Sequence, residues 1–194
     1  MRIRTLTIGA LAVTTVLTLT GCSAPGGEMG GMDHGSSSAP HSADAAAQAD
    51  VAFAMNMIAH HQQAIEMSDV LLGTQGAAPE VAELAERIKA AQQPEIDTMT
   101  QWLTAWGEDP SMGGMDHGDG MMSPDDMAAL EDADGPAASR LFLVQMIVHH
   151  EGAIEMAEQE LADGKDARAL ELAQRVIDDQ TAEIAEMRSM LDAL

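Results

Sequence analysis

A twelve-residue segment that occurs twice carries most of the side chains in this sequence that could do chemistry. It begins at Met57 and returns, in the same register, at Met146. Each copy holds a pair of adjacent histidines three residues after its first methionine; the four are His60, His61, His149 and His150. Imidazole nitrogens and thioether sulfurs together suit soft metal ions. The repeat therefore predicts a metal-binding function.

Helical spacing would place these side chains on one face. Met57, His60, His61 and Ala64 follow an i, i+3, i+4, i+7 pattern, which is one side of an α-helix. The small side chain of Ala64 leaves room for an ion or for a closely packed neighbouring helix. A single core histidine or methionine is most often structural, but two histidine pairs in equivalent registers would be costly to bury without partners.

A second motif, Gln-x-x-Glu-Ile-x-x-Met, follows each histidine segment. It supplies Glu95 and Met99 in the first half and Glu183 and Met187 in the second. Each glutamate shares a helix face with its methionine. We expect the glutamates to hydrogen-bond one histidine of each pair and so orient it, and the methionines to join the metal ligands.

A third motif, Gly-Gly-Met-Asp-His-Gly, occurs in two low-complexity segments. It supplies Met32 and His34 in the first segment and Met115 and His117 in the second. These residues repeat the thioether and imidazole pairing of the histidine segments. We interpret them as flexible arms that capture the same ion.

The donor types favour copper. Di-iron bundles use Glu-x-x-His on two helices, whereas Met57 and Met146 stand where that glutamate would be. Thioethers in place of bridging carboxylates favour Cu(I), and the imidazoles also accept Cu(II). Zinc sites more usually recruit cysteine, histidine and carboxylates.

The amino-terminal segment is typical of a targeting sequence. Arg2 and Arg4 precede an apolar stretch too short for a comfortable membrane span, and the stretch ends at Cys22. Leu19-Thr20-Gly21-Cys22 resembles the lipobox of bacterial lipoproteins. The resemblance implies a signal peptide at 1–21, acylation of Cys22, and a membrane-anchored protein outside the cytoplasm. Because Cys22 is the only cysteine, an intramolecular disulfide is excluded.

Charge and composition exclude some functions and favour helices. The formal net charge is −23, which argues against nucleic acid as a partner, because binding it depends on Lys and Arg. Aromatic residues make up 2% of the chain and tyrosine is absent, so Ala, Leu, Ile and Met must form the core. Such a core suits closely packed helices better than sheets.

The apolar periodicity predicts four long helices. They are expected at about 50–72, from 79 onward, at 136–162 and at 166–193, with Pro94 kinking or breaking the second. Residues 22–49 are predicted to be a flexible tether, and the linker 107–135 to contain one short helix capped by Ser123. The first two long helices and the last two carry the same pair of motifs, so the repeated unit is a hairpin of two helices. Two such hairpins can cover each other's apolar faces, and residues 50–194 should therefore form a four-helix bundle. An apolar face on its alanine-rich helices would allow a homo-oligomer.

Together these residues carry a family resemblance. The His-His-x-x-Ala-Ile-x-Met signature, the later Glu-Ile-x-x-Met, their duplication and the leader resemble the ferritin-like family of secreted bacterial proteins called domain of unknown function 305. The resemblance covers residues 50–193. It implies a four-helix bundle outside the cytoplasm and a role in copper binding and tolerance, at the Met and His positions above. Pro94 and the Met-rich linker 107–135, which forms the crossover between the two hairpins, depart from the family pattern.

The sequence thus predicts a membrane-tethered, extracytoplasmic copper-binding protein that buffers copper and confers tolerance. It shows no pairing of nucleophile and base, so we do not expect an enzyme. A ferritin-like metal oxidase is an alternative, for which only Glu95 and Glu183 offer carboxylates. A haem-binding bundle is another, since Met and His can be axial ligands. In a third, the protein is a structural or stress lipoprotein that binds no metal. The partner that would deliver or accept copper is not indicated.

Overall fold

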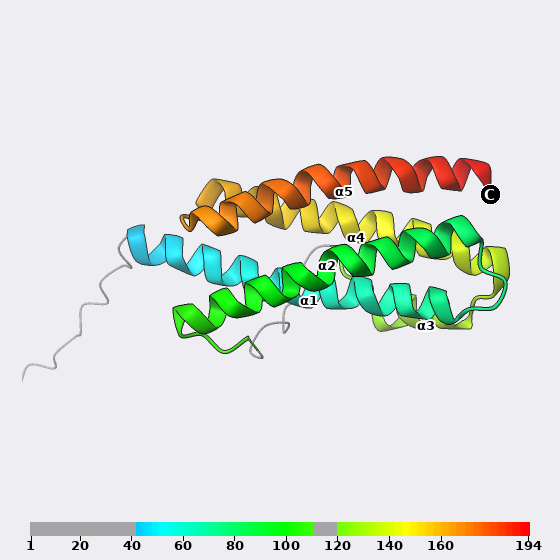
Figure 1. Cartoon of the computed structure of the whole chain (residues 1–194), viewed down its shortest axis with the longest axis horizontal. Helices are drawn as coiled ribbons and strands as arrows, with labels where there is room; N and C mark the ends of the chain where they lie inside the picture. Colours follow the sequence, from blue (N-terminus) through cyan, green and yellow to red (C-terminus); the bar gives the residue numbers. More distant parts are fainter. Residues whose placement is uncertain (1–41, 111–119) are drawn as a thin grey trace, which may run out of the picture. The chain divides into compact units, whose positions relative to one another are not determined.

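Five α-helices make up most of the chain that the structure describes. The structure, a computed structural model, describes residues 42–110 and 120–194, and within them it contains no strand. The helices are α1 (Ser42–Gly73), α2 (Pro79–Trp106), α3 (Pro124–Asp132), α4 (Gly135–Asp163) and α5 (Ala167–Ala193). Figure 1 shows the four long helices running alongside one another, with the short α3 at the side. The predicted all-α bundle is confirmed.

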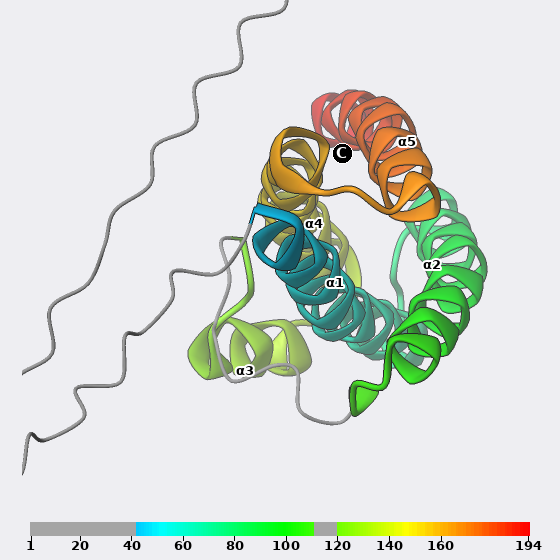
Figure 2. The ribbon, with the colours of Figure 1, turned by 90° about the vertical axis from the view of Figure 1, so that its left-hand side faces the viewer.

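The four long helices form two hairpins that meet through their first helices. α1 packs on α2, α4 packs on α5, and α1 packs on α4. The view along the helices in Figure 2 shows α2 and α5 on one side of the α1/α4 interface and α3 on another. α2 and α5 are joined across the bundle by an ion pair between Arg87 and Glu186. This is the duplicated hairpin that the repeat predicts.

Local sequence signals set most helix ends. Pro79 opens α2, where its missing N–H costs nothing. α2 ends at Gly107, whose φ of +85° favours glycine and whose N–H bonds the last turn. Ser123 caps α3 as expected, and it exchanges side-chain to backbone hydrogen bonds with Asp126 in a capping box.

Two boundaries differ from the prediction. α1 begins at Ser42, eight residues before the expected start at 50, because the alanine-rich run before Asp50 has high helix propensity. α2 continues through Pro94 without a break. Pro94 and Ala90, whose carbonyl loses its hydrogen bond there, are both exposed, so water can satisfy that carbonyl.

The core consists of two apolar clusters, one toward each end of the bundle. On α1, Phe53 and Met57 belong to one cluster, whereas Met67 and Leu71 belong to the other. The same change of cluster occurs along α2, α4 and α5. The buried side chains between the clusters are polar, among them His60, Gln92, His149 and Gln180. Among the described residues, no helix is long and apolar enough to span a membrane.

Candidate metal centre

The four predicted histidines lie between the two apolar clusters. His60 and His61 come from α1 and His149 and His150 from α4, and none is more than 1% exposed. The rings of His60 and His149 meet where α1 and α4 pack together, with their centroids 3.6 Å apart and their planes inclined by 37°. Two histidine pairs from distant segments are thus brought together inside the protein, as their repeated register predicts.

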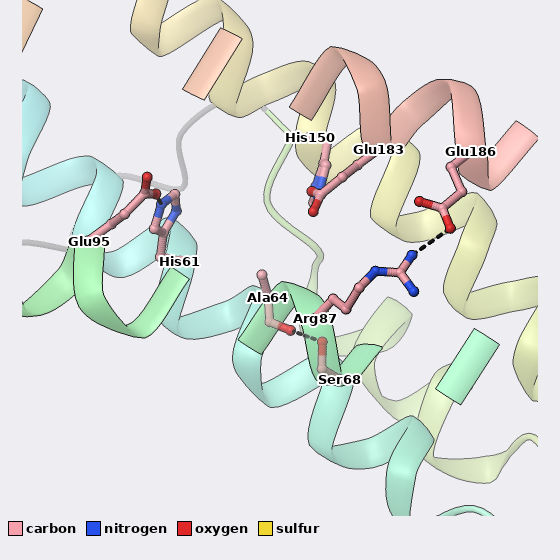
Figure 3. Close-up of polar contacts among 8 residues, drawn as sticks. All are labelled: His61, Ala64, Ser68, Arg87, Glu95, His150, Glu183 and Glu186. Carbon is pink, nitrogen blue, oxygen red and sulfur yellow. Dashed lines mark hydrogen bonds and ion pairs between the residues drawn. The ribbon is translucent and has the colours of Figure 1, made fainter. Parts of the chain in front are cut away.

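Each histidine pair also contacts a carboxylate from the neighbouring helix of its own hairpin. The Nε2 atom of His61 lies 2.7 Å from Oε2 of Glu95, and Nε2 of His150 lies 2.7 Å from Oε2 of Glu183. Figure 3 shows the two pairs, each linking the two helices of one hairpin. The expected glutamate–histidine hydrogen bonds are therefore present. The glutamates remain about a quarter exposed, at 24% and 23%.

These hydrogen bonds determine which ring nitrogen of each histidine has a lone pair available for a metal ion. A carboxylate can only accept, so Nε2 of His61 and of His150 carries the proton. In the neutral ring the lone pair then lies on Nδ1, and in both residues Nδ1 is buried and meets no hydrogen-bond partner among the described residues. A carboxylate that fixes the tautomer and leaves the other nitrogen open is the usual arrangement behind a metal-bound histidine.

Two glutamines complete this buried polar group, and the sequence analysis did not assign them a role. Gln92 and Gln180 are each 4% exposed, and the Oε1 atom of each has no hydrogen-bond partner among the residues described. They stand one helical turn before Glu95 and Glu183. The signal was available, because Gln opens both copies of the Gln-x-x-Glu motif. We define the histidine layer as His60, His61, Gln92, Glu95, His149, His150, Gln180 and Glu183.

Buried thioethers flank the histidine layer on both sides. Met57 and Met99 belong to one apolar cluster, and Met146 and Met187 belong to the other. All four are fully buried. Met57 and Met146 each stand one helical turn before a histidine of the layer, so thioether and imidazole lie on adjacent turns of one face. Each half of the bundle thus contributes the same set of soft donors.

The layer favours the uncharged form of His149. Burial holds the pKa of His149 well below its usual value, and the nearby rings of His60, His150 and His61 lower it further. Four imidazoles this close together cannot all carry charge in a buried site. The His149 ring is therefore neutral at physiological pH, which is the form that binds a metal ion.

The side chains do not by themselves form a site built only of histidine and carboxylate. Among residues 47–110 and 120–194, no group of three or more His, Cys, Asp or Glu side chains converges closely enough to hold one ion. The predicted sites in the Met-Asp-His-Gly segments, and the predicted lipidation site, lie outside the described residues; they are Met32, His34, Met115, His117 and Cys22.

The end of the crossover is held against the α1/α4 interface at the level of the histidine layer. Gln63, two residues after His61, donates from Nε2 to the carbonyl of Met122 at 2.9 Å and accepts from its N–H at 2.7 Å. Gly120, with a φ of +84°, lies so close to Gly152 that a Cβ on it would come within 2.8 Å of the Gly152 Cα atom. Gln63 and Gly152 occupy equivalent positions in the two repeats. In the first repeat Gln63 therefore binds the end of the crossover by hydrogen bonds, and in the second repeat Gly152, which lacks a side chain, allows it to pack closely.

Comparison with known proteins places the chain in a family. The sequence model of the family described as Domain of unknown function (DUF305) matches residues 50–191. The chain belongs to this family. No curated protein sequence matches it.

Solved structures of similar sequence have the same fold. A DUF305 protein from Streptomyces coelicolor, named as a candidate secreted protein, is 30% identical with a TM-score of 0.70, covering 75% of this chain and 93% of its own. A DUF305 fragment from Deinococcus radiodurans is 29% identical with a TM-score of 0.68, covering 75% and 97%. CopM in its Cu(I)-bound form is 30% identical with a TM-score of 0.64, covering 74% and 96%. CopM has also been solved with Cu(II) and with Ag bound.

Proposed function

We propose that this protein binds copper outside the cytoplasm and buffers it, with the ion held at the histidine layer. Copper is the cargo in this proposal, and no chemical transformation of it is required. The similarity to CopM, which binds Cu(I), Cu(II) and Ag, supports copper as the ion. The relative named as a candidate secreted protein supports the location.

One observation carries the proposal: Nδ1 of His61 and of His150 is buried without a hydrogen-bond partner among the described residues, and a buried methionine stands one helical turn before each of them. Burying polar atoms without hydrogen bonds is costly, and His61 Nδ1 and His150 Nδ1 are two such atoms. An ion bound to these nitrogens would replace the missing interactions. The glutamates behind them already hold the required tautomer.

The donor types decide which ion fits. Because no three His or carboxylate groups converge within the described residues of the bundle, we propose that an ion in the layer takes thioether ligands as well as imidazole. Met57, Met99, Met146 and Met187 are the buried thioethers on either side. Mixed sulfur and imidazole coordination favours Cu(I) over hard ions, and Ag(I) should behave similarly. The protonated side of each histidine is occupied by a glutamate, so Glu95 and Glu183 act by orienting the rings.

The remaining parts of the chain fit the same task. In this proposal the Met-Asp-His-Gly segments capture ions at low affinity and pass them to the bundle, and acylated Cys22 keeps the protein at the membrane surface. A lipid-anchored copper buffer would protect the outer face of the membrane, where copper first arrives. We do not propose an enzymatic activity.

A histidine replacement tests the proposal. Changing His60, His61, His149 and His150 together to Ala should abolish tight Cu(I) binding, measured by competition with a chromophoric Cu(I) chelator. The matched control changes His34 and His117, which belong to the two Met-Asp-His-Gly segments, and should keep the tight site. Helical circular dichroism must be retained in both variants. Unchanged Cu(I) stoichiometry and affinity in the folded four-histidine variant would refute the proposal.

A further inference from the structure

A second group of buried polar residues lies at the end of the bundle where α1 begins. Asp50 on α1 is 5% exposed and Glu160 on α4 is 2% exposed, and their carboxyl groups lie side by side. Oδ1 of Asp50 accepts hydrogen bonds from the backbone N–H groups of Lys165 and Asp166, at 2.8 and 3.0 Å. Both carboxyl oxygens of Glu160 are buried, and within the described part of the chain they can hydrogen-bond the Asp50 carboxyl only by sharing a proton with it. A buried carboxylate in this position needs a proton or a cation.

The surroundings of Glu160 offer oxygen donors. It lines a cavity of about 130 Å³ together with Asn56, Gln159 and Asp163. Side-chain amide and carboxylate oxygens are the ligands of hard cations, with water completing the coordination. The residues that line this cavity include no histidine, and Asp50 is not among them, so Glu160 is the side chain that joins the carboxyl pair to the cavity.

The internal repeat provides a comparison for this end of the molecule. At the opposite end, Ser139 occupies the position of Asp50, and its Oγ accepts a hydrogen bond from the N–H of Ala78 at 2.8 Å. Leu71, fully buried, occupies the position of Glu160. Serine and leucine therefore satisfy the same structural requirements in the same fold. Asp50 binds backbone N–H groups as Ser139 does, but the buried carboxyl group of Glu160 has no such structural role and is left to be explained by something that it binds.

We propose that Asp50 and Glu160 hold a hard divalent cation such as Ca²⁺, with amide oxygens and water from the adjoining cavity as further ligands. The ion would link the start of α1 to the α4–α5 turn, because Asp50 already binds the backbone of that turn. Two carboxylates are few for such a site, so the affinity should be in the millimolar range found in extracellular modules. In the ion-free protein, burial and the neighbouring Asp50 raise the pKa of Glu160 to about 8, so that carboxyl keeps a proton until a cation replaces it.

The repeat also supplies the test variant. Asp50→Ser combined with Glu160→Leu gives this end the composition of the opposite end, which the fold already accommodates. Thermal unfolding of the purified protein is followed by circular dichroism with a chelator and then with millimolar Ca²⁺. The wild type should gain roughly 2–4 °C on addition of Ca²⁺ through preferential binding to the folded state. The double variant should fold and should lack most of this gain.

Comparing the wild type with the double variant distinguishes Ca²⁺ binding at this site from general screening of the protein's negative charge. Ca²⁺ also screens a chain of net charge −23, but that screening acts on the wild type and the variant nearly equally. An equal rise in both proteins, or no rise in the wild type, would overturn the proposal and leave a shared proton as the partner of Glu160. The result is independent of copper, since the four-histidine variant should show the full Ca²⁺ effect.

Discussion

Single residues in the histidine layer are organised by the pairing of imidazole with carboxylate. The sequence predicts that Glu95 and Glu183 each bond one histidine of a pair, because both motifs repeat in register, and the structure identifies these histidines as His61 and His150. It does not predict that His60 and His149 stack, because that contact depends on how deeply α1 and α4 approach each other. The carboxyl pair of Asp50 and Glu160 escaped prediction for the same reason, since its members are far apart in the sequence.

The glutamates should matter for affinity without binding the ion. Changing Glu95 and Glu183 together to Gln keeps the shape but removes the charged acceptor behind each histidine. We expect a loss of Cu(I) affinity of about 10–100-fold, as is usual when the group that orients a metal-bound histidine is replaced. A chelator competition titration measures it. Asp97→Asn, an exposed change on the same helix as Glu95, should have no effect, and equal affinities in all three proteins would show that the pairs are only structural.

The thioethers should distinguish the two oxidation states of copper. Met57 and Met146 changed to Leu keep the side-chain volume, so the loss of stability should be small. Cu(I) affinity should fall more than Cu(II) affinity, because thioether is a soft ligand and imidazole accepts both ions. Parallel Cu(I) and Cu(II) titrations decide this. Met67→Leu is the control, because Met67 is equally buried but further from the histidines along α1. If this variant has the same Cu(I) affinity as the double variant, Met57 and Met146 only fill the core.

At the scale of helices, local signals explain most of the fold and tertiary contacts explain the rest. Proline, serine and glycine at the helix ends predict where α2, α3 and α4 begin or end. The prediction that Pro94 breaks α2 was wrong, because Pro94 lies on the exposed side of the helix, where water can replace the lost hydrogen bond. The positions of Gly120 and Met122 at the end of the crossover are set by Gly152 and Gln63, which differ although they occupy equivalent positions in the two repeats. Periodicity alone does not show that difference.

Two glycines allow the contact of the crossover with α4 to be measured. Gly120 and Gly107 have nearly the same φ, +84° and +85°, but a Cβ on Gly107 would meet nothing within 4 Å. Gly107→Ala should cost about 1–2 kcal/mol of unfolding free energy from the backbone conformation alone. Gly120→Ala should cost about 1–3 kcal/mol more, because the methyl group would collide with α4. Urea unfolding compares the two variants, and equal losses would mean that the crossover does not rest on α4.

At the scale of the whole molecule, duplication accounts for the architecture. One hairpin leaves an apolar face uncovered, and two cover each other's faces and bring both copies of the motif to the centre. The sequence predicts this because the repeat is strong. It cannot predict which ends of the repeat have diverged, such as Ser139 and Leu71 opposite Asp50 and Glu160, until the fold shows that these positions correspond.

The large negative charge should make stability depend on salt. A net charge of −23 repels itself more in the compact state than in the unfolded chain, and salt screens that repulsion. We expect the unfolding temperature to rise by about a few degrees between 10 mM and 500 mM NaCl. Differential scanning calorimetry measures the shift. A midpoint that falls with salt would instead mean that surface ion pairs such as Arg87–Glu186 outweigh the repulsion.

The most direct test of copper binding at the histidine layer is a crystal structure of the copper-loaded protein with anomalous scattering measured at the copper edge. Our account predicts an anomalous peak inside the bundle, bonded to at least one imidazole nitrogen among His60, His61, His149 and His150 and to a methionine sulfur. Copper found only on the surface, with the histidine layer empty and its hydrogen bonds unchanged, would contradict the account.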